Sequence, residues 1–162
     1  MKHLFSSFFF LFSLVSLAQT EVHVYLLEDC PMAQFYGPTF RELQKDSPET
    51  RWIFIFPNSN DSLAAQNYLQ KHRLRSAATI LETASASIWK NDQPFAVSPS
   101  VVVWCQQNMV YRGAIDDAFA APGKRRMIYQ NHYLKEAISN PKNVEKKSIQ
   151  PVGCILSLPQ TH

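Results

Sequence analysis

A nearly continuous apolar run in the middle of the chain constrains the fold most strongly. The segment RWIFIFP, from Arg51 to Pro57, has almost no polar alternation. Such a run is typical of a strand that is buried on both faces, because its two sets of side chains both meet apolar neighbours. The sequence therefore predicts an internal strand of a layered protein.

The segments around this run predict alternating strands and helices. Val22, Val24 and Leu26 follow a period of two and predict a strand that ends at the acidic pair Glu28 and Asp29. The other signals predict a helix that starts at Cys30 and is kinked or split at Gly37–Pro38, a helix over 62–72, a short strand near Ile80, a short helix near Ile88 and Trp89, a hairpin of strands over 101–104 and 109–112, a loop over 113–127, and a helix over 129–139.

This order of elements favours an α/β fold, namely a thioredoxin-like three-layer sandwich with a central mixed sheet. Ferredoxin-like and flavodoxin-like arrangements begin in the same way, so the order alone leaves them open. The chain has 162 residues, of which 46% are hydrophobic and 18% charged. This composition excludes a disordered or fibrous chain, and the length fits one domain.

An apolar run at the amino terminus predicts a secretory signal peptide over residues 1–18. Lys2 and His3 precede the run LFSSFFFLFSLVSLA, which ends in small residues before Gln19. The run is shorter than the roughly 20 residues that span a bilayer, so a retained anchor is the less favoured alternative. The mature chain would be a single domain over residues 19–162 with a cysteine-containing tail. We expect it to be periplasmic or secreted, without a stable membrane span, in an oxidising compartment.

Several function classes are excluded by composition and spacing. The four glycines stand far apart, so the chain lacks the clustered glycines of nucleotide-binding loops. The net charge of +3 is too small to indicate a nucleic-acid partner. The basic run Lys124–Arg126 is interpreted as a solvated loop. The acidic pair Asp116–Asp117 is interpreted as a helix cap or loop contact.

Cys30 is the main candidate for chemistry. It is predicted to lie between the first strand and the first helix, where a helix amino terminus lowers a thiol pKa and produces a reactive thiolate. Glu28 and Asp29 act against this effect, because like charges raise the pKa of a thiol. Ala33 stands where a C-x-x-C motif would have its second cysteine, so a self-contained dithiol is not expected.

Cys154 and Cys105 are the other two cysteines. A bridge between Cys30 and Cys154 is plausible and would serve either structure or redox chemistry, but three cysteines permit three single pairings. Cys105 shares the parity of Val101 and Val103 and is interpreted as a small core residue, with a role as resolving partner for Cys30 as the alternative.

The remaining candidates are weaker. Pro99, directly before the Val101–Trp104 strand, is a candidate cis proline beside the thiol. His23, His72 and His132 lack the spacing of a metal site and are interpreted as solvated or hydrogen-bonded. We expect no cofactor and no resident metal, although a site for Cu(I) at Cys30 and Cys154 with a histidine is an alternative. Trp104 and Tyr111 are interpreted as core residues.

Four segments together resemble the redoxin-domain branch of the thioredoxin-like superfamily, which includes alkyl hydroperoxide reductase and thiol-specific antioxidant relatives. They are EDCPMAQFYGPTFREL, SPSVVVW, YRGAIDD and the terminal VGC. The resemblance implies a thioredoxin fold, a reactive-position Cys30 and a cis proline at Pro99. Leu27 and His23 replace residues of the peroxiredoxin pattern, which disfavours peroxide reduction.

These observations predict a thiol–disulfide oxidoreductase-like protein. Cys30 would react with a protein disulfide or be oxidised, Cys154 or an external thiol would resolve the mixed disulfide, and Pro99 would shape the substrate side. The alternatives are a non-catalytic binding module that is stabilised by a structural disulfide and a copper-handling accessory protein. The sequence does not indicate an oligomeric state.

Overall fold

The computed structural model describes residues 19–59, 61–145 and 147–157. The predicted signal peptide, residues 1–18, lies outside the described residues. Within the described part, no helix has both the length and the apolar character that crossing a membrane requires.

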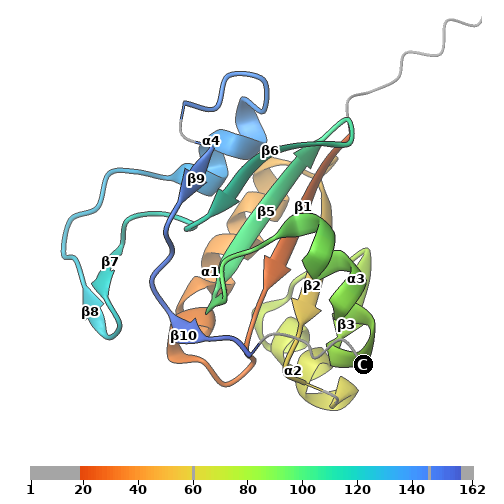
Figure 1. The fold of residues 1–162 in the computed structure, drawn as a ribbon. Helices are drawn as coiled ribbons and strands as arrows, with labels where there is room; N and C mark the ends of the chain where they lie inside the picture. The colour runs from red at the N-terminus through yellow and green to blue at the C-terminus, as the bar shows by residue number, and fades with distance from the viewer. Residues whose placement is uncertain (1–18, 60, 146, 158–162) are drawn as a thin grey trace, which may run out of the picture.

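A six-stranded mixed sheet forms the centre of the described structure, with the strand order β3-β2-β1-β5-β6-β9 (Figure 1). The pairs β1–β2, β2–β3 and β6–β9 are parallel, and the pairs β1–β5 and β5–β6 are antiparallel. The strands are β1 Thr20–Tyr25, β2 Arg51–Phe56, β3 Ala78–Leu81, β5 Ser100–Cys105, β6 Asn108–Gly113 and β9 Ser148–Ile149.

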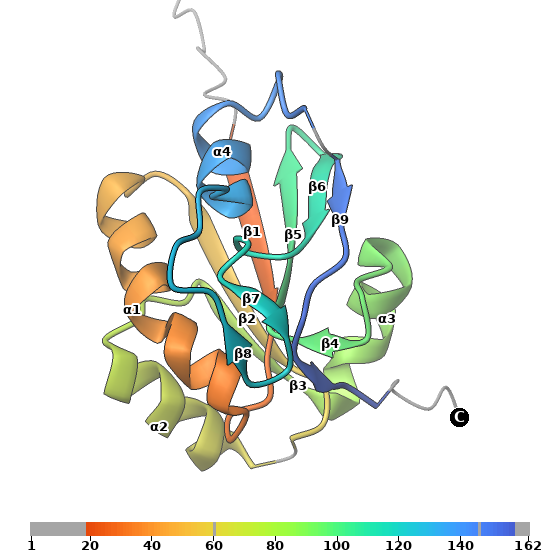
Figure 2. The same ribbon diagram turned by 90° about the vertical axis from the view of Figure 1, so that its left-hand side faces the viewer.

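Helices cover both faces of this sheet, which confirms the predicted three-layer α/β fold. Figure 2 shows α1 (Pro31–Asp46), α2 (Ser62–His72) and α4 (Tyr133–Ser139) on one side and α3 (Glu82–Asp92) on the other. The buried side chains form a larger cluster under the three helices, which includes Val24 and Phe54, and a smaller one toward α3, which includes Tyr25 and Ile55. Neighbouring residues of β1 and β2 thus alternate between the two clusters, as a doubly covered sheet requires.

Gly37 and Pro38 lie inside one continuous helix, so the predicted split of α1 is wrong. Pro38 is exposed, and the loss of one backbone donor is outweighed by the buried helix face that includes Tyr36 and Phe40. Gly37 has a packing role, since a Cβ atom there would collide with the imidazole of His72 on α2. Its missing side chain lets the two helices approach closely.

The carboxyl-terminal third contains strands that the sequence did not predict. The expected loop over 113–127 includes a hairpin of β7 (Phe119–Ala121) and β8 (Lys124–Arg125), and α4 begins at Tyr133 rather than at position 129. The tail forms β9 and β10 (Cys154–Ile155), and β10 pairs antiparallel with β4 (Val97–Ser98). Strands of two or three residues are too short to show a hydrophobic period, so the sequence does not predict them.

Candidate active site

Cys30 occupies the N-cap of α1, as the sequence predicted. Pro31 takes the first helical position, where its missing N–H costs no hydrogen bond, and the N–H of Gln34 donates to the Cys30 carbonyl at 3.0 Å. Neither a capping side-chain hydrogen bond nor an acidic side chain of the first turn neutralises this end of the described helix. The Cys30 sulfur therefore lies at the positive end of the helix dipole.

Cys30 and Cys154 form a disulfide across 124 positions, with their Cα atoms 6.2 Å apart. This is one of the three pairings that the sequence left open. Cys30 is only 2% exposed, whereas Cys154 is partly exposed. Cys105 is a free, buried cysteine, as its interpretation as a small core residue predicted.

Ser98 and Pro99 stand against this disulfide. Their peptide bond is cis, as expected for Pro99. The Cys30 Sγ lies 3.4 Å from the Ser98 carbonyl oxygen, and the N–H of Leu27 donates to the Ser98 Oγ at 2.8 Å. Ser98 thus joins the segment before Cys30 to the segment before β5. No local sequence pattern predicts this role.

The tail reaches Cys30 along the edge of β4. Cys154 pairs with Ser98 and Ile155 with Val97. A Cβ atom at Gly153 would collide with the Ser98 carbonyl, so only glycine allows this approach. Leu156 is buried in the cluster toward α3, and its N–H donates to the carbonyl of Ala96 at 3.0 Å. Pairing and burial therefore hold the tail on both sides of the disulfide.

An apolar groove of about 450 Å³ adjoins Cys154. It lies between the first turns of α1 and the β7–β8 hairpin, which stand side by side in Figure 2. Phe35 and Phe119 face each other edge to face at 5.1 Å, and the Arg125 guanidinium lies 4.6 Å from the Phe35 ring centroid. The groove is lined by Pro31, Met32, Phe35, Phe119, Pro122, Gly123, Arg125, Gly153 and Cys154.

The acidic pair after β6 makes loop contacts, as predicted. Asp116 accepts hydrogen bonds from the Tyr36 hydroxyl and from the Ala118 N–H, and burial raises its pKa. Asp117 accepts from the backbone and side chain of Asn131. Both carboxylates therefore hold the loop between β6 and α4.

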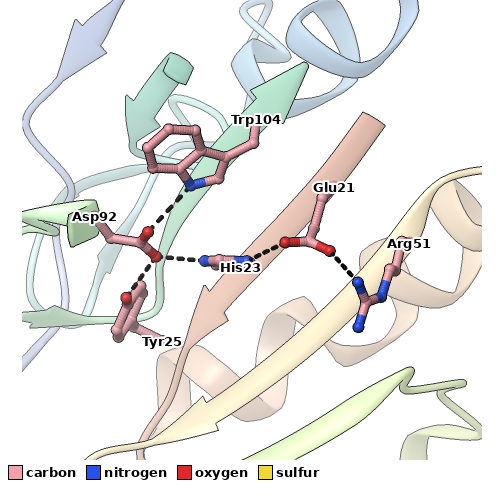
Figure 3. Close-up of polar contacts among 6 residues, drawn as sticks. All are labelled: Glu21, His23, Tyr25, Arg51, Asp92 and Trp104. Atoms are coloured by element: carbon pink, nitrogen blue, oxygen red, sulfur yellow. Dashed lines mark hydrogen bonds and ion pairs between the residues drawn. The ribbon is translucent and has the colours of Figure 1, made fainter. Parts of the chain in front are cut away.

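A buried polar network lies on the α3 side of the sheet (Figure 3). The two ring nitrogens of His23 face carboxylates, Nδ1 at 2.5 Å from Asp92 and Nε2 at 2.7 Å from Glu21. Burial disfavours the imidazolium, but the hydrogen bonds and charges of Asp92 and Glu21 outweigh it, so the pKa of His23 is raised. His23 is thus a hydrogen-bonded histidine, as interpreted from the sequence.

The network extends to both neighbouring strands. Asp92 also accepts from the Tyr25 hydroxyl at 2.6 Å and from the Trp104 Nε1 at 3.1 Å, and Glu21 pairs with Arg51 at 2.9 Å. Trp104 is only partly buried but packs against the smaller core cluster, and Tyr111 is buried as expected. The one sequence signal was the period of two that places Glu21, His23 and Tyr25 on one strand face.

Comparison with known proteins gives structural but no sequence relatives. No protein-family model matches the chain, and no curated protein matches it significantly. A secreted Mycobacterium tuberculosis disulfide oxidoreductase, homologous to Escherichia coli DsbE, has a TM-score of 0.54 at 15% identity over 75% of this chain and 81% of its own. The fold is thioredoxin-like.

Two further structures are similar over most of the chain. A hypothetical protein from Sinorhizobium meliloti has a TM-score of 0.63 at 19% identity and covers 86% of this chain and 79% of its own. An uncharacterized conserved protein from Geobacillus kaustophilus has a TM-score of 0.64 at 17% identity, with 89% and 80% covered. In this thioredoxin-like fold, the Cys30–Cys154 disulfide joins the amino terminus of α1 to the tail.

Among the described residues, no group of three or more His, Cys, Asp or Glu side chains is arranged to hold a metal ion.

Proposed function

We propose that the protein is an exported thiol–disulfide oxidoreductase that uses Cys30 and Cys154. The observation that carries the proposal is the position of the disulfide, at the amino terminus of α1 and against Ser98–Pro99, with Cys154 partly exposed. The fold shared with a secreted disulfide oxidoreductase and the apolar leader of residues 1–18 support the activity and the export, respectively.

In the reduced protein, Cys30 is proposed to act as the nucleophile. Its thiolate attacks one sulfur of a substrate disulfide, so that a Cys30–substrate bond forms and the other substrate sulfur leaves as a thiolate. The Cys154 thiolate then attacks the Cys30 sulfur and releases the second substrate sulfur. The substrate gains two electrons, and the protein returns to the Cys30–Cys154 disulfide.

The position of Cys30 supports this role. The backbone N–H groups of the first turn of α1 stabilise a thiolate there, which increases its reactive fraction at neutral pH. Pro99 is buried, follows the Ser98 carbonyl that lies 3.4 Å from the Cys30 sulfur, and contributes no N–H group. It is proposed to shape the side from which the substrate approaches.

The test is the reduction potential of the disulfide, measured by thiol trapping and peptide mapping across defined redox buffers. A working disulfide has a reduction potential above about −300 mV and opens in moderately reducing buffers. A structural disulfide has a reduction potential below this value and stays closed in the same buffers. Foreign protein trapped on Cys30 in a Cys154→Ser variant would support the same conclusion. A bridge that persists in strongly reducing buffers would overturn the proposal and favour a crosslinked binding module.

A further inference from the structure

The two sulfurs of the disulfide differ in their surroundings. Cys30 is 2% exposed and does not line the apolar groove, whereas Cys154 is partly exposed and lines it. An incoming thiol therefore has a path to Cys154. We infer that the protein's reductant attacks Cys154 through this groove, with a cysteine that is flanked by an apolar side chain. The inference rests on the proposed function. It specifies which sulfur the reductant attacks and which kind of residue stands beside the reductant's cysteine.

The attacking thiol must come from outside the chain. Cys105 is the third cysteine, and it lies at the end of β5 opposite Thr20, whereas Ser100 at the other end adjoins Pro99. Five residue-to-residue steps along β5 separate these ends by about 17 Å. Cys105 is also buried, so it cannot serve as the resolving partner of Cys30 in this fold.

The groove determines what surrounds the incoming cysteine. Its walls are apolar side chains from two elements, Met32 and Phe35 on α1 and Phe119 on β7. Arg125 is the one charged side chain among the described residues that line it, and its guanidinium lies over the Phe35 ring. A segment with an apolar residue beside its cysteine would gain by burial there. Glutathione, with its charged groups, would lose hydration.

The reaction balances if the reductant is a dithiol. Its first thiolate attacks the Cys154 sulfur, a mixed disulfide forms, and Cys30 leaves as a thiolate at the amino terminus of α1, where a thiolate is a good leaving group. In the mixed disulfide, the first sulfur of the reductant is bonded to the Cys154 sulfur. The second thiolate of the reductant then attacks that first reductant sulfur and releases the Cys154 thiolate, which takes a proton from water. The reductant loses two electrons as its own disulfide forms.

The test compares two short, uncharged peptides with one cysteine each, flanked by Phe and Leu in the first and by Ser in the second. The second-order rate constant for opening the disulfide of the oxidised full-length protein is measured with each peptide. We expect the apolar peptide to react about tenfold faster, the factor that burial of part of one apolar side chain gives. Acid quenching and peptide mapping should find the first mixed disulfide on Cys154.

Variants test whether the groove is responsible. Phe35→Ser removes one wall, and Pro122→Glu places a charge at the exposed rim without removing a hydrogen-bond donor, so both should bring the ratio of the two rates close to one. Leu63→Ser is the matched control, because Leu63 is apolar and 62% exposed but lies on α2 outside the groove. This control should keep the ratio of the wild type.

Three results would overturn the inference alone: equal rates for the two peptides, a rate ratio that survives in both groove variants, or a mixed disulfide on Cys30. In each case, the disulfide is still reducible and the proposed function stands. A disulfide that neither peptide opens at any concentration overturns the proposed function, and this inference with it.

Discussion

At the residue scale, the geometry of the disulfide depends on small groups beside the cysteines. The Ser98 carbonyl group contacts the neighbourhood of both cysteines. Its oxygen lies 3.4 Å from the Cys30 Sγ, and Gly153, which precedes Cys154, packs against the same carbonyl group. Because the tail meets Ser98 backbone to backbone, a single added carbon atom at position 153 is enough to displace it. The reactivity of Cys154 is therefore sensitive to a residue that carries no chemistry itself.

Gly153→Ala should make the disulfide easier to reduce. Overpacking costs about 1–3 kcal/mol, and this strain is relieved when the tail leaves Ser98, so the reduction potential should rise by about 30 mV. The measurement is the oxidised fraction in glutathione buffers, with Gly123→Asn as the control. A Cβ atom at Gly123 meets nothing within 4 Å, and its left-handed backbone suits Asn. An unchanged potential in Gly153→Ala would contradict the contact.

Cys154→Ser should lower the stability of the protein under oxidising conditions. A disulfide that closes a loop of this length stabilises the fold by about 5 kcal/mol in the chain-entropy model. Urea unfolding of the wild type and the variant measures this difference. In the presence of a strong reductant, the two curves should come close together, and a difference of the same size in both buffers would point to a packing role for the sulfur instead.

Single residues were predicted from the sequence where a local signal exists. Cys30 and Pro99 have such signals, because a Cys-Pro pair after a strand and a proline before a valine run are visible in the sequence. The partner of Cys30 was left open, since 124 positions separate the two cysteines and spacing does not determine pairing. The contacts of Asp92 with His23 and Trp104 were missed for the same reason.

At the element scale, the Glu21–His23–Asp92 network fastens α3 to the sheet. Asp92 is the last residue of α3, and it accepts hydrogen bonds from side chains on β1 and on β5. With a carboxylate at each ring nitrogen, His23 binds both as an imidazolium. The charge of the His23 ring therefore contributes to the attachment of α3, beside the hydrogen bonds that Tyr25 and Trp104 donate to Asp92.

His23→Gln should destabilise the protein in a pH-dependent way. The pKa of His23 is raised in the folded state, so its contribution is fully present below the unfolded pKa of about 6.5 and is lost as the pH rises through the folded pKa. The loss of unfolding free energy in the variant should be about 3 kcal/mol in acid, and it should shrink toward alkaline pH. Urea unfolding over a pH series measures it, and a difference that does not vary with pH would contradict the charged pair.

Gly37→Ala should separate α1 from α2. The added carbon collides with the His72 ring, and overpacking of this kind costs about 1–3 kcal/mol. A double-mutant cycle with His72→Ala tests the cause, because the two changes should be less costly together than the sum of their separate effects. Strict additivity would show that the ring is not the obstacle.

The longer elements were predicted well, as were the short strand near Ile80 and the helix near Ile88, whereas the strands of two or three residues were not. α2 has the predicted bounds, and β2 matches the buried run, since both depend on patterns over several residues. The β7–β8 hairpin was missed because β8 consists of exposed Lys124 and Arg125. Two exposed basic residues in sequence are typical of a solvated loop, so the sequence around them does not indicate a strand.

At the scale of the whole molecule, the tail closes the structure along the edge of β4. It crosses from β9, at one edge of the main sheet, to β10 beside the amino terminus of α1 (Figure 1). Besides the disulfide, the tail is held by the pairing of Cys154 and Ile155 with β4, by the burial of Leu156, and by two hydrogen bonds between Ser157 and Asn58. Such a small contact area depends on the covalent bond.

Reduction should therefore loosen the tail and leave the main sheet intact. We expect hydrogen exchange at the amide of Leu156, which donates to the Ala96 carbonyl, to accelerate by at least about tenfold in the reduced protein, because short paired segments open locally, while the amides of β1 and β5 stay protected. Mass spectrometry of exchanged fragments measures both regions. Equal protection of the tail in the two redox states would contradict this expectation.

The burial of Cys105 has a consequence for how the chain must be made. Synthesis produces Cys30 first, Cys105 next and Cys154 last, so a newly made chain offers Cys30 a wrong partner before the right one exists. Once β5 joins the sheet, Cys105 is buried at the far end from Pro99, and only the late-arriving tail can complete the bridge. Folding of the sheet thus selects the native disulfide, and a chain that is oxidised while unfolded should accumulate the Cys30–Cys105 isomer.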